Sequence, residues 1–281
     1  MNLHFITSVS KEYWELVGQH CIPTWDLPGR VTVYVEQTQG DIKWVKDIPF
    51  DTEILTVPDL PLDPKFVTRK FLKFWGKAWA QIYSIKHRGN SERIVWLDAD
   101  IEQIAPATQR MFAFKLKTAV AMMNSGDGQD CWESGIVVFN EDQNKLGKFV
   151  HIYHKRWEDQ DFLETLWRPY DAQVLGSVAD SSGYTNLCKE PCPNALAVKT
   201  TMYADTFHHW INKENKELLK AGPTFEQLEF NLENDNSSDI PSEFNLENDN
   251  SSDIPSEFNL ENDNSSDIPS DSSEREEPRE D

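Results

Sequence analysis

The stretch Arg-Ile-Val-Trp-Leu-Asp-Ala-Asp, residues 93–100, decides the class of fold. Its first five residues form a largely apolar run between a Gly-Asn pair and two acids, which is typical of a strand buried in a sheet. Asp98 and Asp100 come directly after this strand, so both carboxylates leave the sheet at its carboxyl edge, where open α/β sheets bind ligands. Two acids at this spacing on a turn can bind one hard cation such as Mn²⁺ or Mg²⁺, although such pairs often serve only as loop caps.

Strands and helices are expected to alternate on both sides of this stretch. Short apolar or β-branched runs predict strands, and apolar residues at helical spacing predict helices. The predicted strands are Leu3–Thr7, Val31–Glu36, Arg93–Leu97, Thr118–Met123 and Gly135–Asn140, and the predicted helices are Lys11–Cys21, Pro64–His87 and Asn144–Trp157. This alternation predicts an α/β fold, a single domain with a mostly parallel central sheet flanked by helices.

A change in composition marks a boundary near residue 221. Residues 221–281 contain 19 Asp and Glu against 2 Lys and Arg, a net charge of -17 out of the formal -21, which leaves -4 for residues 1–220. Phe230, Phe244 and Phe258 open three near-identical copies of a 14-residue repeat. The expected organisation is a folded domain over 1–220 and an acidic, low-complexity, disordered tail over 221–281. The tail is interpreted as a spacer, with docking through its Phe-x-Leu motifs as the alternative.

Charge and cysteine content exclude several classes of protein. A folded part near neutrality does not predict nucleic acid as a main partner. The four cysteines, Cys21, Cys131, Cys188 and Cys192, make neither a disulfide framework nor a complete zinc set and are expected to be reduced. The first residues have no basic segment followed by a long apolar run, and no apolar stretch of 18 residues occurs. A soluble cytoplasmic protein without a membrane span is the expectation.

A second motif follows the Asp pair at a distance of some 30 residues. Trp132-Glu133-Ser134-Gly135 precedes the apolar run Ile136–Asn140. The ordered pair, Val-Trp-Leu-Asp-Ala-Asp followed by Glu-Ser-Gly-Ile-Val-Val-Phe-Asn, resembles glycosyltransferases of the GT-A fold, over roughly residues 1–215. The resemblance implies that the Asp98-Ala99-Asp100 motif holds a metal ion and the phosphates of a nucleotide-sugar donor, and that Ser134 and Gly135 line the sugar pocket.

Residues that precede the Asp pair are candidates for donor binding. The resemblance implies that Thr7 and Ser8, at the end of the first strand, line the nucleoside pocket; they could equally be strand-end caps. Arg69, Lys73 and Lys77 follow one another in steps of four, so they share a helix face and could offer positive charge to a diphosphate. A solvated basic face is the alternative for any one of them.

Candidates for the remaining chemistry lie later in the chain. His208 or His209 matches the place where many GT-A enzymes supply a third metal ligand, and an imidazole suits Mn²⁺ better than Mg²⁺. Inverting transfer, the preferred interpretation, needs a carboxylate that takes the proton of the acceptor hydroxyl. Glu133 and Asp171 are the two candidates for this base, and the sequence does not choose between them. A retaining mechanism would need neither.

A narrower resemblance concerns the substrate. The compact size and the segment Thr-Phe-His-His-Trp-Ile-Asn-Lys-Glu-Asn-Lys-Glu look like the small glycosyltransferase domain of chlorella viruses, whose enzymes build capsid glycans. This resemblance implies a UDP-sugar donor, UDP-L-rhamnose or UDP-glucose, a glycan or glycoprotein acceptor such as a capsid-protein N-glycan, and a place in the host-cell cytoplasm.

Two other functions compete with this hypothesis. A nucleotidyltransferase that makes sugar nucleotides would also use an Asp-bound metal, but the first strand here is followed by Ser-Val-Ser-Lys-Glu-Tyr-Trp rather than by a glycine-rich loop. A non-catalytic carbohydrate-binding or scaffold protein would show neither metal dependence nor donor hydrolysis.

Overall fold

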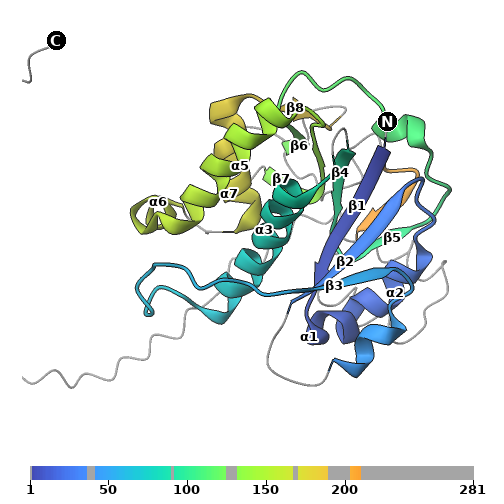
Figure 1. Cartoon of the computed structure of the whole chain (residues 1–281), viewed down its shortest axis with the longest axis horizontal. Coiled ribbons are helices and arrows are strands. Elements are labelled where there is room, and N and C mark those ends of the chain that lie inside the picture. The colour runs from blue at the N-terminus through green and yellow to red at the C-terminus, as the bar shows by residue number, and fades with distance from the viewer. Residues whose placement is uncertain are drawn as a thin grey trace, which may run out of the picture. The chain divides into compact units, whose positions relative to one another are not determined.

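The computed structural model describes residues 2–36, 42–89, 92–124, 132–166, 170–188 and 203–209. Their centre is a seven-stranded sheet in the order β3-β2-β1-β4-β7-β6-β8, with a two-stranded sheet of β5 and β9 beside it (Figure 1). The strands are β1 Asn2–Val9, β2 Arg30–Glu36, β3 Asp51–Leu55, β4 Glu92–Leu97, β5 Ile101–Gln103, β6 Val120–Asn124, β7 Trp132–Phe139, β8 Thr185–Asn186 and β9 Phe207–His209. The predicted tail 221–281, Cys131 and Cys192 lie outside the described residues.

The strand directions confirm a mostly parallel sheet. β1 pairs in parallel with β2 and β4, and β2 pairs in parallel with β3. β7 runs antiparallel between β4 and β6, and β8 is again parallel to β6. The first four strands in the sheet order therefore end at one carboxyl edge, and β7 enters the sheet from that same edge.

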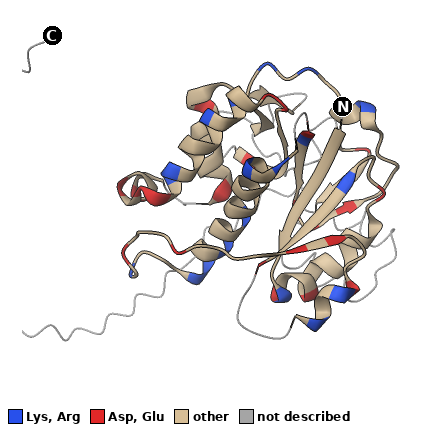
Figure 2. Cartoon of the chain, in the orientation of Figure 1, with Lys and Arg blue, Asp and Glu red and all other residues tan. Residues whose placement is uncertain are grey.

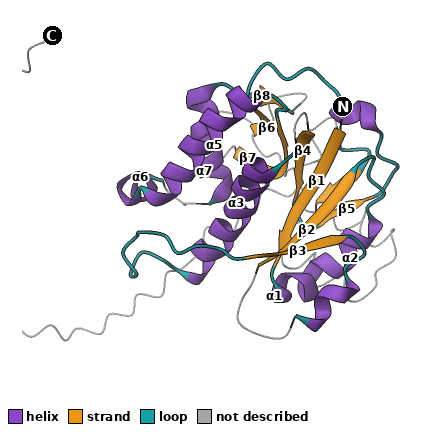
Figure 3. Cartoon of the chain, in the orientation of Figure 1, coloured by secondary structure: helices purple, strands orange, loops and turns teal. Residues whose placement is uncertain are grey.

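Helical segments cover both faces of the sheet (Figure 3). The α-helices are α1 Lys11–Tyr13, α2 Gln19–Cys21, α3 Arg69–His87, α4 Gln109–Phe112, α5 Gln143–Glu158, α6 Gln160–Thr165 and α7 Asp171–Ser182, with a π-helical turn at Trp14–Gly18 and 3₁₀ turns at Ile22–Thr24 and Lys43–Asp47. One buried cluster joins α3, α5 and α7 to the sheet, and a second cluster joins the other face to α4, β5, β9 and the helical turns after β1. This arrangement is the expected α/β fold.

The two-sided burial explains why β1 and β4 are continuous apolar runs. In β1, Phe5 lies in one cluster and Ile6 in the other. In β4, Val95 lies in the same cluster as Phe5, and Trp96 lies in the same cluster as Ile6. Successive side chains of a strand point to opposite faces, so a strand covered on both sides needs apolar residues at nearly every position.

Two predicted elements begin elsewhere in the structure, and one predicted helix keeps its ends but is irregular in the middle. The long helix begins at Arg69 rather than at Pro64, because the Thr68 hydroxyl accepts from the Phe71 amide and caps it there. The predicted helix Lys11–Cys21 is divided into two short α-helices by the π-helical turn. The strand predicted over Gly135–Asn140 begins earlier, at Trp132, because its pairing with β6 starts there, so Glu133 and Ser134 also lie within β7.

Among the described residues, no helix combines the length and the apolar character that crossing a membrane requires.

Candidate functional site

The turn after β4 places two carboxylates at the carboxyl edge of the sheet. The Asp98 amide donates to the Gly135 carbonyl at 2.9 Å, and the Asp98 carbonyl accepts from the Ile101 amide at 3.0 Å. This tight turn leads at once into β5, with Ala99 buried inside it. β5 pairs antiparallel with β9, where Ile101 lies opposite His209. The pairing brings an imidazole from late in the chain back to the Asp pair.

Asp98, Asp100 and His209 form a group that could hold a metal ion. One ligand atom from each lies within 4.8 Å of the other two. His209 Nε2 is 3.1 Å from Asp100 Oδ1 and 3.8 Å from Asp98 Oδ2, and the side chains of His209 and Asp100 are only 7% and 6% exposed. Two carboxylate oxygens and one imidazole nitrogen are ligands that suit Mn²⁺, and the three atoms already face one another. The residues present therefore fit such a cation.

The two neighbouring histidines have different places in β9. His208 lies opposite Glu102 and His209 opposite Ile101. Because adjacent residues of a strand project to opposite sides, His208 points away from the side on which His209 meets the carboxylates. The absence of a side chain at Gly135 leaves space for the His209 ring, because a Cβ at this position would lie 2.8 Å from His209 Cε1 and 3.0 Å from Nδ1.

Lys77, from α3, joins the Asp pair to a second carboxylate. Its Nζ lies 2.7 Å from Asp98 Oδ1 and 2.8 Å from Asp171 Oδ2, and it donates to Ser134 Oγ at 2.9 Å. The three hydrogens of its ammonium group thus have three acceptors within reach. The two carboxylates raise the pKa of Lys77 although burial opposes this, so the side chain is a fixed positive charge.

Asp171 and Ser134 complete this network from two further elements. Asp171 is the first residue of α7, and its Oδ2 also accepts from Ser134 Oγ at 2.5 Å. Both residues are buried. Four elements (α3, β7, α7 and the turn after β4) therefore meet at Lys77.

Glu133 lies beside this cluster on β7. Burial raises its pKa to about 7, an effect that the nearby charge of His209 opposes. Burial likewise raises the pKa of Asp98, although Lys77 acts against it. Carboxyl groups with raised pKa values in a cluster of charges are common at active sites.

The residues expected near a nucleoside lie at the end of β1. Ser8 Oγ donates to Glu36 Oε1 of β2 at 2.8 Å, beside Gly76 of α3, where a Cβ would lie 2.9 Å from that carboxyl group. Burial raises the pKa of Glu36 to about 7. Thr7 is fully buried, and its hydroxyl finds no hydrogen-bond partner within the described part of the chain.

Arg69 and Lys73 share a face of α3 with Lys77 but lie outside the carboxylate network. Figure 2 shows Lys and Arg along the N-terminal half of this helix. Both residues pair with Glu12 of α1, at 2.8 Å and 3.4 Å. The Arg69 side chain is 83% exposed, so the structure places it at the surface.

Two aromatic residues that sequence reasoning missed hold the Asp pair. The Trp96 indole N–H donates to Asp98 Oδ1 at 2.6 Å, and the Tyr13 hydroxyl donates to Asp100 Oδ2 at 2.7 Å. Trp96 lies two positions before Asp98, which was a usable signal, whereas nothing in the sequence around Tyr13 indicates a contact 87 residues away.

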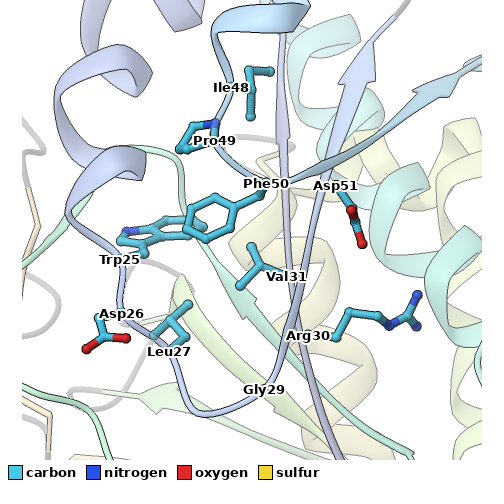
Figure 4. Close-up of a pocket in the computed structure, with 10 residues that line it drawn as sticks. All are labelled: Trp25, Asp26, Leu27, Gly29, Arg30, Val31, Ile48, Pro49, Phe50 and Asp51. Atoms are coloured by element: carbon cyan, nitrogen blue, oxygen red, sulfur yellow. The ribbon is translucent and has the colours of Figure 1, made fainter.

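A cavity of about 550 Å³ lies elsewhere, beside the first residues of β2 and β3 (Figure 4). The Trp25 and Phe50 rings lie 6.3 Å apart in it, with Asp26, Arg30 and Asp51 among its polar residues. Arg30 and Asp51 begin parallel strands that end at the Asp98 edge. The cavity therefore lies at the opposite edge of the sheet and is not part of the candidate site.

Comparison with known proteins gives structural likeness but no sequence match. No protein-family model and no curated protein matches the chain. The apo structure of the bifunctional glycosyltransferase WbbM is similar at a TM-score of 0.51 and 12% identity, over 82% of this chain and 51% of WbbM. The galactosyltransferase LgtC, solved with donor and acceptor sugar analogues, has a TM-score of 0.49 and 10% identity over 81% of this chain and 99% of LgtC. The apo glycosyltransferase GlyE of Streptococcus pneumoniae TIGR4 has a TM-score of 0.45 and 12% identity over 66% of this chain and 45% of GlyE.

The chain thus spans about half the length of WbbM and less than half of GlyE. At these identities the likeness shows the fold alone. Together with the sheet order, it defines the chain as a protein of the GT-A type of fold.

Proposed function

We propose that the chain is a metal-dependent glycosyltransferase that moves a sugar from a nucleotide-diphosphate donor to an acceptor hydroxyl. The observation that carries the proposal is the Asp98, Asp100 and His209 group at the carboxyl edge of a GT-A sheet. Open α/β sheets bind their ligands at that edge. These three residues would hold Mn²⁺ or Mg²⁺, and the cation would neutralise charge on the diphosphate as it leaves.

Lys77 is proposed to organise the site rather than to grip the donor directly. Its three acceptors already belong to the protein, and one of them is the candidate metal ligand Asp98. By holding Asp98 and Asp171 in one geometry, Lys77 removes the need to reorganise them when substrate binds. Arg69 and Lys73, which pair only with the exposed Glu12 among the contacts described above, are better able to turn toward a diphosphate.

Glu133 is the better supported candidate for the base of inverting transfer. A general base works best with a pKa near the working pH, and burial raises the pKa of Glu133 to about 7. Asp171 Oδ2 is already occupied by Lys77 and Ser134. In this mechanism the acceptor oxygen attacks the anomeric carbon, the bond from that carbon to the diphosphate breaks, and the hydroxyl proton passes to Glu133. Asp171 then serves to hold Lys77 and Ser134 in position.

The end of β1 is proposed to receive the nucleoside. Ser8 and Glu36 place a hydroxyl and a carboxyl group side by side at the carboxyl edge of neighbouring strands. Thr7 contributes only to the floor of this region, since its side chain is fully buried. Ser134 and Gly135 would lie under the transferred sugar, between Lys77 and the His209 ring.

The finer assignment of substrates comes from the sequence resemblance alone. It favours a UDP-sugar, UDP-L-rhamnose or UDP-glucose, and a glycan or glycoprotein acceptor such as a viral capsid-protein N-glycan, with transfer in the host-cell cytoplasm. The change in composition near residue 221 assigns the catalytic domain to residues 1–220 and a spacer role to 221–281, whose acidic repeats carry none of the proposed site residues.

Calorimetric binding of UDP to the wild type and to Asp100→Ala, with and without Mn²⁺, tests the proposal. We expect binding that requires Mn²⁺ in the wild type and that is lost in the variant. Asp51→Ala is the matched control, because this exposed aspartate lies at the opposite edge of the sheet. Metal-independent UDP binding that survives Asp100→Ala would exclude the proposed role of the metal ion. No UDP binding under any condition would exclude the proposal in its UDP form.

A further inference from the structure

We infer that Tyr13 is a positioning residue for the metal site: its hydroxyl fixes the Asp100 carboxylate so that one chosen oxygen faces His209. The inference rests on the proposed function, because it concerns the cation that the Asp98, Asp100 and His209 group would hold.

The two oxygens of Asp100 have different partners. Oδ2 accepts from the Tyr13 hydroxyl at 2.7 Å, whereas Oδ1 lies 3.1 Å from His209 Nε2. A carboxylate held in this way cannot rotate about its terminal bond without breaking the hydrogen bond to Tyr13. Oδ1 is therefore the oxygen presented to a cation between Asp98, Asp100 and His209.

Burial makes this hydrogen bond effective. The Asp100 side chain is only 6% exposed, so little water is available to replace the tyrosine hydroxyl. A hydrogen bond from a neutral donor to an ionised acceptor is roughly twice as strong as one between neutral groups. Removing the hydroxyl would take this donor away from Oδ2 in an enclosed place and would weaken the hold on the orientation of the carboxylate.

Tyr13 reaches Asp100 from an element that carries none of the three ligands. It lies in α1, directly after β1, where the Ser10 side chain accepts from the Tyr13 amide at 3.3 Å. Its ring packs against the buried cluster under this face of the sheet and against Val17 and Cys21. Position and orientation of the hydroxyl are thus fixed before any metal binds. Groups that orient metal ligands in this way typically change metal affinity by 10- to 100-fold when they are removed.

The test is a titration with Mn²⁺ alone, in which the electron paramagnetic resonance signal of free Mn²⁺ gives the dissociation constant. Tyr13→Phe removes the hydroxyl and keeps the ring. We expect its dissociation constant for Mn²⁺ to rise by about 10-fold or more. Tyr34→Phe is the matched control, because it also removes a buried tyrosine hydroxyl, one that accepts from Ser84 at 2.6 Å away from the Asp pair. Its Mn²⁺ affinity should equal that of the wild type.

Asp100→Ala separates the failure of this inference from the failure of the proposed function. If the wild type binds Mn²⁺ and Asp100→Ala does not, the metal site is supported. In that case an unchanged Mn²⁺ affinity of Tyr13→Phe would overturn the positioning role of Tyr13 alone. Equal losses in Tyr13→Phe and Tyr34→Phe would also overturn it, because a general loosening of the core would then explain both. If the wild type and Asp100→Ala bind Mn²⁺ alike, the metal site is wrong and the inference falls with it. Far-UV circular dichroism of each variant shows that the fold is retained.

Discussion

Two cations lie at the opposite ends of β4, one buried and one half-buried, and they differ in what surrounds them. Arg93, near the start of the strand, donates to the Glu141 carboxylate and to the backbone carbonyls of Phe112 and Phe114. Lys77 meets the turn after the strand and faces Asp98 and Asp171, with Asp100 and Glu133 close by. Among the described residues, Arg93 is paired with the Glu141 carboxylate and with neutral carbonyl groups. Lys77 lies among several carboxyl groups, with His209 as a second basic group beside them.

This difference separates a site that stabilises the fold from the candidate functional site. Arg93 ties two segments to the sheet, the stretch 112–114 and the residue Glu141 that follows β7. The carboxylates around Lys77 repel one another, which costs stability unless another positive charge enters. Such a concentration of like charge in an enclosed place is common at sites that bind a cation or perform chemistry.

The strongest test of this contrast is Lys77→Met. Without the ammonium group, Asp98 and Asp171 lose their common partner, and we expect kcat for sugar transfer to fall by about 100- to 1,000-fold. The measurement is nucleotide release at saturating donor and Mn²⁺. Lys145→Met, at the surface of α5, should leave kcat unchanged. If the Lys77→Met variant kept a nearly normal kcat, Lys77 would have no role in the proposed site.

Arg93→Met should have the opposite pattern. The carbonyls of Phe112 and Phe114 lose their donor, so the free energy of unfolding in urea should fall by about 2–4 kcal/mol. The kcat of the remaining folded protein, measured at low temperature, should stay near the wild-type value. If kcat fell instead while the free energy of unfolding was unchanged, the contrast between the two cations would not hold.

Glu36 extends the comparison to a half-buried acid whose described hydrogen-bond partner is Ser8. Folding raises its pKa from 4.5 to about 7, so the folded state favours the protonated form and stability is lost as pH rises from about 4.5 to 7. Glu36→Gln avoids this loss. Relative to the wild type, its free energy of unfolding should increase by up to about 3 kcal/mol between pH 4 and pH 8.

Urea unfolding at several pH values measures this change. Glu15→Gln is the control, since Glu15 is exposed and pairs only loosely with Lys11 at 3.7 Å. The control should show no comparable trend. The same pH dependence in wild type and Glu36→Gln would mean that Glu36 is not buried as an unbalanced charge.

The fold was predictable because its strongest signals are local. A strand covered on both sides is apolar at nearly every position, and the largely apolar run Arg93–Leu97 has this pattern. The edge of the sheet at which Asp98 and Asp100 emerge follows from the same run. Helix ends were harder, since the Thr68 cap that starts α3 competes with an apolar pattern extending back to Pro64.

The arrangement of the site was not predictable in the same way. Asp171, Ser134 and Lys77 come from three elements that meet only through tertiary packing. His208 and His209 cannot be told apart by composition, because the choice depends on which side of β9 faces the Asp pair. Tyr13 acts through a hydrogen bond across 87 positions, and no spacing rule reaches that far.

The pairing of β5 with β9 also has a consequence for the order of events during synthesis. Asp100 and His209 are separated by 109 positions, so the imidazole leaves the ribosome roughly 5–20 seconds after the carboxylates at ordinary translation rates. Closing so long a loop is entropically costly and slow compared with the pairing of neighbouring strands. The nascent chain therefore carries an acidic turn without its third candidate ligand while these 109 positions are added, and the candidate cation site is among the last parts of the domain to be completed.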